Sequence, residues 1–237
     1  MFLADVHSHI LYGVDDGAKN KSVMLKMLDN AYANGVRVIC VTPHYNPELF
    51  EYNPNGEEKA YNDLLEYSKE KYPDLRLYRW NEVYVFSGVP SFLIENKREF
   101  VAGSNNVLIE FSVSATFQDI ADTVHGMMSL GYKSVLAHVE RYKNITKRNV
   151  AQLKQMGAVI TVNAESVMGY NGWSTARFVK GLIKRGAVNI VSSDAHSLDA
   201  YNCFSEAYKL VLKKYGEAVA EPLFWSNANN LFIKETE

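Results

Sequence analysis

The sequence predicts an α/β protein with a barrel-like parallel sheet, and two patterns along the chain indicate this fold. Short apolar runs alternate with longer amphipathic stretches throughout the 237 residues. Three of the amphipathic stretches end on a glycine, which commonly caps a helix, shortly before the next apolar run. Helix, capping glycine and apolar strand in this order are typical of βα units around a parallel sheet.

Seven apolar runs are predicted to be strands, and their number and order favour a (β/α) barrel over an open sheet. They cover residues 2–9, 36–42, 75–83, 107–112, 134–139, 158–163 and 188–193. Amphipathic helices are predicted over residues 23–35, 119–131 and 174–186, and a closing helix over 220–232. The stretch 55–72 mixes charges of both signs like a solvated helix face. No Pro/Gly/Ser-rich linker divides the chain, so residues 1–237 are expected to form a single domain.

Composition restricts the function classes. Hydrophobic residues make up 47% of the chain and can fill a sizeable core, while the formal net charge is −2. No Lys/Arg stripe is visible, which disfavours nucleic acid as a partner. We find neither a charged-then-apolar leader nor an apolar run long enough to span a bilayer. The expected location is therefore the cytoplasm, without insertion into a membrane.

The two cysteines exclude two further possibilities. Cys40 and Cys203 cannot form a disulfide framework, and Cys40 lies in an apolar run as a small buried side chain would. Neither cysteine is followed by an arginine six residues later, since Asn46 and Lys209 occupy those positions. The phosphate-binding loop of cysteine-dependent phosphatases is therefore absent.

Histidines and carboxylates gather where the predicted strands end. Five of the six histidines lie at such ends, and the sixth, His125, falls within a predicted helix. The strand-end residues, in chain order, are His7, His9, Asp15, Asp16, His44, Glu82, Glu110, His138, Arg141, Asp194 and His196. Because the carboxyl ends of parallel barrel strands open onto one face, these side chains are expected to converge there.

The residue types and spacings indicate a metal site. In His7-Ser8-His9 the two imidazoles point to the same side of a strand, and Asp194 and His196 repeat that spacing. Imidazole and carboxylate are ligands for Zn, Mn and Fe, and their number here exceeds what one ion needs. Taken singly, each histidine is explained by structural hydrogen bonding, and Asp15 by an ordinary turn before Gly17. Taken together, so many carboxylates would repel one another without cations.

Four segments resemble a known superfamily. "DVHSHI", "TPHY", "AHVER" and "SDAH", in this order and spacing, resemble the PHP (polymerase and histidinol phosphatase) superfamily. "HSHILYGVDDG" and "LIEFS…AHVER" are most similar to the manganese-dependent tyrosine-protein phosphatases of bacterial capsule and exopolysaccharide loci. The resemblance extends from residue 1 to about residue 200.

This resemblance implies a distorted (β/α)7 barrel that binds three divalent ions, with Mn²⁺ expected and Fe or Zn sharing the same ligands. It assigns His7, His9, Glu82 and Asp194 to one ion. It assigns Asp16, His44 and His196 to a second ion. Glu110 and His138 would hold the third, with Glu82 as a bridge. Arg141, from the "AHVER" segment, would bind the phosphoryl group through its planar guanidinium as a catalytic residue.

The implied activity is metal-dependent hydrolysis of phosphotyrosine in a protein, with a bacterial tyrosine kinase bearing a tyrosine-rich tail as the partner. The alternative is a small-molecule PHP phosphatase such as histidinol phosphatase. Two others stay open, a phosphodiesterase or exonuclease and a weakly catalytic module that docks on a kinase. The aromatic-rich stretch 43–58, predicted as a surface loop beside the site, suits an open groove for a peptide.

The chain departs from the family pattern at three positions. Val139 replaces a proline before the Glu of "HPER", and Asn81 replaces a glycine before Glu82. A second arginine often follows the final Asp-x-His pair, but Tyr201 stands roughly there. We therefore expect Arg177 or a loop tyrosine to supply part of the phosphate contact.

Overall fold

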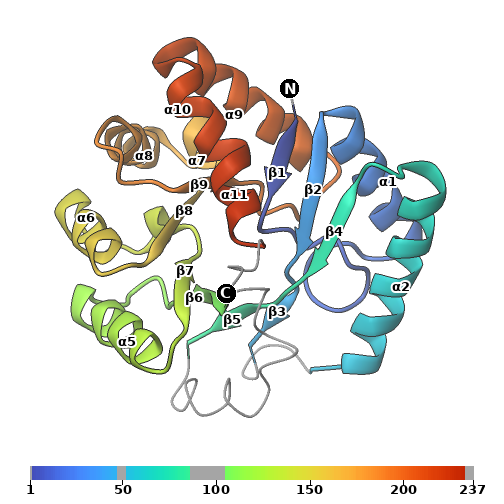
Figure 1. Cartoon of the computed structure of the whole chain (residues 1–237), viewed down its shortest axis with the longest axis horizontal. Coiled ribbons are helices and arrows are strands. Elements are labelled where there is room, and N and C mark those ends of the chain that lie inside the picture. The colour runs from blue at the N-terminus through green and yellow to red at the C-terminus, as the bar shows by residue number, and fades with distance from the viewer. Residues whose placement is uncertain (1, 47–51, 86–104, 233–237) are drawn as a thin grey trace.

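The parallel strands curl around a common interior, and most helices lie outside them, as Figure 1 shows. The computed structural model of the chain describes residues 2–46, 52–85 and 105–232. Its strands are β1 (Leu3–Asp5), β2 (Val36–Val41), β3 (His44–Tyr45), β4 (Arg76–Arg79), β5 (Glu82–Tyr84), β6 (Asn106–Glu110), β7 (Lys133–Leu136), β8 (Val159–Asn163) and β9 (Ile190–Ser192). Every strand pairing among them is parallel.

The strands form two sheets that continue into one another. Their orders are β1-β2-β4 and β3-β5-β6-β7-β8-β9. The backbone N–H of Trp80 donates to the Val41 carbonyl at 2.9 Å, and that of Glu82 donates to the Pro43 carbonyl at 3.1 Å. The predicted strand 75–83 is therefore present as β4 and β5, which pair in turn with β2 and β3.

The last strand of the curl returns to the first. The Asp194 N–H donates to the His7 carbonyl at 2.9 Å, and the His9 N–H donates to the Ala195 carbonyl at 3.0 Å. Ser8 and Ala195 form a parallel bridge between these segments. With β2–β3 and β4–β5 each counted once, seven strand positions surround the interior, which confirms the predicted α/β barrel.

Helices cover the outside of the sheet. They are α1 (Lys21–Ala33), α2 (Pro54–Lys71), α5 (Phe117–Ser129), α6 (Lys147–Gln155), α7 (Ala164–Met168), α8 (Trp173–Lys184), α9 (Ala200–Tyr215), α10 (Glu217–Glu221) and α11 (Asn227–Asn230). The predicted helices at 23–35, 119–131 and 174–186 correspond to α1, α5 and α8. Thr116 caps α5 and Thr146 caps α6, each in a reciprocal capping box with the third residue of its helix.

Two predictions about local structure are corrected. Residues 54–58, expected in a loop, begin α2, because the Asn53 side chain accepts the Gly56 N–H at 2.9 Å and Pro54 suits the first turn. Residues 47–51 of that stretch lie outside the described residues. The closing helix is broken into α10, a π-helical turn (Pro222–Ser226) and α11.

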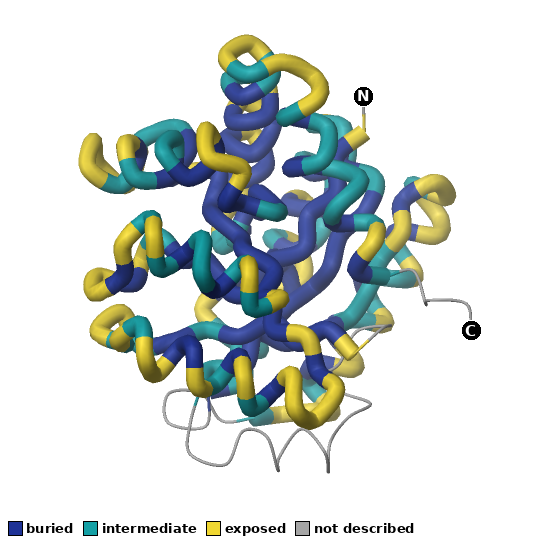
Figure 2. The backbone as a smooth tube through the Cα atoms, turned by 60° about the vertical axis from the view of Figure 1, so that its left-hand side comes forward, coloured by how far each residue is buried: buried dark blue, intermediate teal, exposed yellow. Residues whose placement is uncertain are grey.

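Burial follows this architecture, with buried strands and exposed outer helix faces (Figure 2). One apolar cluster lies between the sheet and the helices, and a second fills the barrel interior. Cys40 and Trp80 belong to the interior cluster, which Leu231 joins from the α11 side. Both cysteines are buried and free, as expected. Among the described residues, none of the helices combines the length and apolar character needed to cross a bilayer.

Candidate metal centre

The strand ends bring together all ten residues predicted for the site. His7 and His9 follow β1, His44 begins β3, and Glu82 begins β5. Glu110 ends β6, while Asp194 and His196 follow β9. His138 follows β7 and leads into a 3-10 turn (Val139–Arg141) that carries Arg141. By contrast, His125 lies on an exposed face of α5.

Glu82 is the centre of the cluster. One carboxylate oxygen, Oε2, lies 3.1 Å from His7 Nε2 and 3.0 Å from His44 Nδ1. The same oxygen lies 3.4 Å from His9 Nε2. Its other oxygen, Oε1, lies 2.9 Å from His138 Nε2. A single buried carboxylate thus contacts imidazoles from three different strand positions.

Asp194 completes one side of the cluster. Its Oδ1 lies 3.4 Å from both His7 Nε2 and His9 Nε2, and those two nitrogens are 3.0 Å apart. Its Oδ2 accepts a 2.6 Å hydrogen bond from the Asn163 side-chain amide at the end of β8. The carboxylate is therefore oriented from one side, with an oxygen left to face the histidines.

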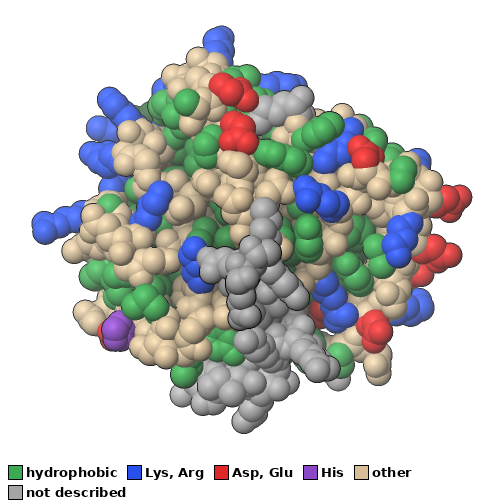
Figure 3. Space-filling view, in the orientation of Figure 1, with side chains coloured by type: hydrophobic (Ala, Val, Ile, Leu, Met, Phe, Trp, Pro, Cys, Tyr) green, Lys and Arg blue, Asp and Glu red, His purple; other side chains and the backbone are tan. Residues whose placement is uncertain are grey.

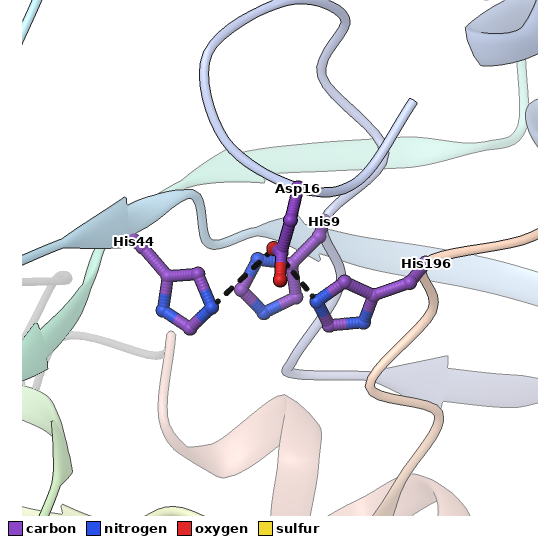
Figure 4. A group of neighbouring side chains, drawn as sticks. All are labelled: His9, Asp16, His44 and His196. Carbon is purple, nitrogen blue, oxygen red and sulfur yellow. Dashed lines mark ion pairs between the residues drawn. The ribbon is translucent and has the colours of Figure 1, made fainter. Parts of the chain in front are cut away.

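Asp16, in the loop after β1, lies between a histidine that begins β3 and a histidine that follows β9. Its Oδ1 lies 3.2 Å from His196 Nε2 and 3.6 Å from His44 Nε2. Figure 4 shows the two imidazoles pointing at this carboxylate from opposite sides, with the His9 ring beside it. The resemblance assigns Asp16, His44 and His196 to one ion, and His9 also lies within range of that group.

Glu110, His138 and Arg141 form the third side. Glu110 Oε1 lies 3.6 Å from His138 Nε2, and Glu110 Oε2 lies 3.9 Å from His44 Nδ1. Arg141 Nη1 lies 3.9 Å from Glu110 and 4.0 Å from Asp194. The Arg141 side chain is 49% exposed. It is therefore placed between the cluster and solvent, where a substrate anion would arrive.

Two residues of the cluster have an unusual backbone conformation. His138 has φ 29° and Asp194 has φ 52°, both in a region that non-glycine residues rarely adopt. The His138 N–H donates to Thr161 Oγ1 at 3.2 Å, and the Asp194 N–H donates to the His7 carbonyl. These contacts hold strained residues in place, as is common where side chains must be aimed at a functional site.

The histidines keep the central carboxylates ionised. Burial alone would raise the pKa of Glu82, but the neighbouring imidazoles of His7, His138 and His44 outweigh it and hold that pKa well below its usual range. The pKa of Asp194 is likewise held well below normal by His7 and His9 against the effect of burial. Burial and the nearby Glu82 charge raise the pKa of Glu110.

Asp15 does more than the ordinary turn expected of it. Its carboxylate accepts the Gly17 N–H at 2.9 Å, which is the turn, but it also contacts His9 Nδ1 at 2.8 Å and accepts the His44 N–H at 3.1 Å. It therefore orients two histidines of the cluster. The same turn approaches His9 so closely that a Cβ on Gly17 would lie 1.9 Å from the His9 carbonyl oxygen.

A buried polar network that the sequence did not reveal lies beneath the cluster. Asp5 accepts the Ser193 N–H at 2.9 Å and also the Ser193 hydroxyl. Tyr201, with its side chain fully buried, lies 2.8 Å from the Ser8 hydroxyl through its own hydroxyl. Because Ser8 separates His7 from His9, and Ser193 precedes Asp194, this network supports both ligand pairs from behind.

Removing the Tyr201 hydroxyl should therefore weaken the site modestly. We expect Tyr201→Phe to lower metal affinity about tenfold and stability by about 1 kcal/mol. Manganese titration and thermal unfolding of the variant measure the two effects. Tyr215→Phe is the matched control, since that hydroxyl bonds only a carbonyl on α8 at 3.5 Å. Wild-type metal affinity in Tyr201→Phe would remove the hydroxyl from the support of the site.

A cavity of about 430 Å³ opens over the cluster. Its lining includes Asp16, Arg141 and Asp194, together with four residues that sequence reasoning missed, which are Asn46, Tyr84, Glu165 and Ser197. Arg177, one of the two expected sources of a second phosphate contact, does not line this cavity, whereas the other, a loop tyrosine, stays a prediction. Tyr201 is buried beneath the cluster, and Arg177 lies on α8 with its guanidinium 5.3 Å from the Trp173 ring centroid. Among the described residues, Arg141 is the one Lys or Arg that lines this cavity.

The donor set suits divalent metal ions. Four overlapping groups have ligand atoms within 4.8 Å of one another, and together they use each of the nine predicted ligands. They are His9-Asp16-His44-His196, His7-His9-Asp194, His7-Glu82-His138 and His44-Glu82-Glu110. Lone pairs from histidine and carboxylate that converge in this way are the ligand set of Mn, Fe or Zn.

The fold and the site together place the chain in the class of PHP-type α/β-barrel proteins, with a candidate metal centre at the strand ends. A family model described as "Capsular polysaccharide synthesis, CpsB/CapC" matches residues 3–233. The chain therefore belongs to the CpsB/CapC family.

Named relatives agree with this membership. The chain is 30% identical to the tyrosine-protein phosphatase CpsB of Streptococcus pneumoniae, over 98% of this chain and 99% of that protein. It is 28% identical to CpsB of Streptococcus agalactiae serotype III (strain NEM316), over 97% and 98% of the two chains. It also matches a solved structure described as YwqE from Bacillus subtilis and CpsB from Streptococcus pneumoniae, "unique metal-dependent tyrosine phosphatases". That match has a TM-score of 0.82 and 26% identity, and it covers 92% of this chain and 90% of the other.

Proposed function

We propose that this protein is a metal-dependent tyrosine-protein phosphatase whose substrate is a phosphotyrosyl protein. The observation that carries the proposal is the convergence of nine histidine and carboxylate ligands around Glu82, with Arg141 at the open side. Relatives that match nearly the whole chain are named as tyrosine-protein phosphatases, which supports the same activity. In this proposal residues 1–237 act as one PHP-type metallophosphatase domain.

The nine residues would hold three divalent ions, with Mn²⁺ as the expected metal. His7, His9, Glu82 and Asp194 would bind the first, and Asp16, His44 and His196 the second. Glu110 and His138 would bind the third, with Glu82 shared between sites. The 2.9 Å approach of Glu82 to His138 and its 3.1 Å approach to His7 support a bridging role for this carboxylate.

Bound divalent ions would supply an activated water and neutralise phosphoryl charge. The protein's own groups orient the substrate. Arg141, half exposed at the cavity, donates to phosphoryl oxygens and stabilises the charge they develop in the transition state. Phenolate, with a pKa of about 10, leaves readily enough that a strong general acid is less needed than for an alkyl phosphate. The chain would then form no phosphoenzyme, in keeping with its buried, free cysteines.

Replacing Arg141 tests whether the residue acts on the substrate in the transition state and not on the bound metal. We expect Arg141→Ala to lower kcat by about 10²- to 10³-fold, because a donor to the transition state is lost, while bound metal is unchanged. Steady-state kinetics and metal analysis of the same preparation measure both. Arg76→Ala, at an exposed arginine of β4 that does not line the cavity, serves as the control. Normal turnover by Arg141→Ala would remove this residue from the mechanism.

The proposed partner is a bacterial tyrosine kinase with a phosphorylated, tyrosine-rich tail in the cytoplasm, and the proposed role is control of capsule or exopolysaccharide synthesis. The description of the family model supports this role. The alternative is a small-molecule phosphatase such as histidinol phosphatase. Phosphate release from a phosphotyrosyl peptide and from histidinol phosphate, with manganese and with EDTA, tests the proposal. Preference for the peptide is expected, and preference for histidinol phosphate would overturn the assignment of substrate.

A further inference from the structure

Positive charge is concentrated in one segment of the chain. Residues 141–193 contain nine of the 25 Lys and Arg but only one of the 27 Asp and Glu, which is Glu165. This segment therefore carries +8 and the rest of the chain −10, although the formal net charge is −2. The sequence shows no Lys/Arg stripe because these cations are spread over two helices and the segments beside them instead of standing in a run.

The segment forms one side of the molecule. It contains α6 and α8, which lie side by side in Figure 1, and Lys147 at the start of α6 lies 5.8 Å from the ring centroid of Phe178 on α8. Figure 3 shows Lys and Arg side chains gathered along this side. We call this surface the basic flank, and its cations are Lys143, Lys147, Arg148, Lys154, Arg177, Lys180, Lys184 and Arg185.

The charges of the basic flank are not neutralised within the described part of the protein. None of its eight cations forms an ion pair with a described carboxylate, whereas four other cations, on or beside α1, α2, β2 and β4, each do. Lys154 donates to the Gly186 carbonyl at 2.8 Å and Arg185 to the Gly181 carbonyl at 3.1 Å. These hydrogen bonds go to neutral backbone carbonyls, so they do not neutralise the positive charge of either side chain.

The basic flank is continuous with the candidate active site. Arg141 lines the cavity, and Lys143 follows it two residues later. Lys147 and Arg148 stand in the first turn of α6, which has no acidic residue. Cations at a helix N-terminus oppose the helix dipole, so helix stability does not account for them. Together with Arg141 they place positive charge on the surface beside the cavity, whose own lining includes Asp16, Glu110, Glu165 and Asp194.

We propose that the basic flank binds an acidic stretch of the phosphotyrosyl protein, so that the preferred substrate is a phosphotyrosine flanked by Asp or Glu. This inference rests on the proposed function. An acidic segment complements eight unpaired cations, and its phosphotyrosine adds about −1.5 to −2 of charge at neutral pH. Attraction of this kind raises association rates by about 10- to 10³-fold and weakens as salt is added.

The test compares two phosphotyrosyl peptides that differ only in flanking residues, Glu in one and Gln in the other, with the full manganese-loaded chain. We expect kcat/KM for the Glu peptide to be about tenfold higher at low ionic strength, mainly through KM, and the preference to vanish at high salt. The flank variant Lys143→Glu/Arg148→Glu/Arg177→Glu should lose this preference. It should hydrolyse p-nitrophenyl phosphate within about twofold of wild type, because the metal cluster is untouched.

The matched control is Lys26→Glu/Lys69→Glu/Lys133→Glu, which makes the same change of charge at exposed positions outside the flank. This variant should keep the preference for the Glu peptide. Equal loss in both variants would assign the effect to net charge and overturn the inference. Wild-type protein that hydrolyses the two peptides equally would also overturn it, while leaving the proposed function intact.

Two other results separate this inference from its rivals. If neither peptide is hydrolysed although p-nitrophenyl phosphate is, the proposed function fails and the inference fails with it. Binding to phosphatidylserine vesicles or duplex DNA is measured for the same variants. If the flank variant loses such binding but keeps the wild-type peptide preference, the flank serves a membrane or a nucleic acid, and an acidic protein segment is the wrong occupant.

Discussion

Glu82→Gln should lower turnover of a phosphotyrosyl peptide by about a thousandfold or more, with the fold retained. The Glu82 carboxylate contacts His7, His44 and His138 at 3.1, 3.0 and 2.9 Å, so it is shared by histidines from three strand positions. An amide keeps the shape but removes the negative charge and one lone-pair donor. We therefore expect metal affinity to fall at all the metal positions that share this carboxylate.

Steady-state kinetics, metal analysis and circular dichroism of Glu82→Gln measure turnover, occupancy and fold separately. Glu58→Gln, at an exposed position on α2, is the matched control and should behave as wild type. We expect turnover and metal content to fall together while the circular dichroism spectrum is unchanged. Turnover within about tenfold of wild type would show that Glu82 is not shared between metal positions.

Removing the metal should abolish activity and destabilise the protein. Asp194 lies within 4 Å of His7, Glu110 lies within 4 Å of His138, and Glu82 contacts both histidines, so bound cations would offset the repulsion among these three carboxylates. A metal ion that binds only the folded state, at a free concentration 100 times its Kd, raises the free energy of unfolding by about 2.7 kcal/mol. For a chain of this size that corresponds to a Tm difference of about 5–10 °C.

Thermal unfolding and phosphate release are measured after EDTA treatment and dialysis, and again after manganese is restored. Both Tm and activity should recover on addition of metal. The Glu82→Gln variant is the control, and its Tm should respond much less to either treatment. Full activity and an unchanged Tm in the chelated wild type would contradict a metal-dependent mechanism.

The barrel could be predicted because its signals are local. Apolar runs and the glycines that end helices mark each βα unit, and the strand ends then place His7, His138 and Asp194 on one face without further information. The break between β4 and β5 could not be seen in this way. It arises because one continuous apolar run pairs with two successive strands, a tertiary feature that the run itself does not record.

The residues that support the site from outside were harder to predict. Asp15 has the sequence context of a turn residue, and its contact with His9 depends on how the loop folds back. Tyr201 stands roughly where the family pattern has a second arginine, but it lies on the buried face of α9, with its hydroxyl 2.8 Å from that of Ser8. Direct ligands follow from residue type and strand position, whereas these supporting contacts depend on the packing of helices against the sheet.

The number of metal ions bound per chain is the most direct test of a shared metal centre. Protein loaded with manganese and freed of excess metal by gel filtration is analysed for bound metal, beside Glu82→Gln prepared in the same way. We expect about three equivalents in the wild type, because nine ligand side chains converge, and clearly fewer in the variant. A wild-type chain that binds no manganese, or binds it equally well without the Glu82 carboxylate, would contradict a shared metal centre.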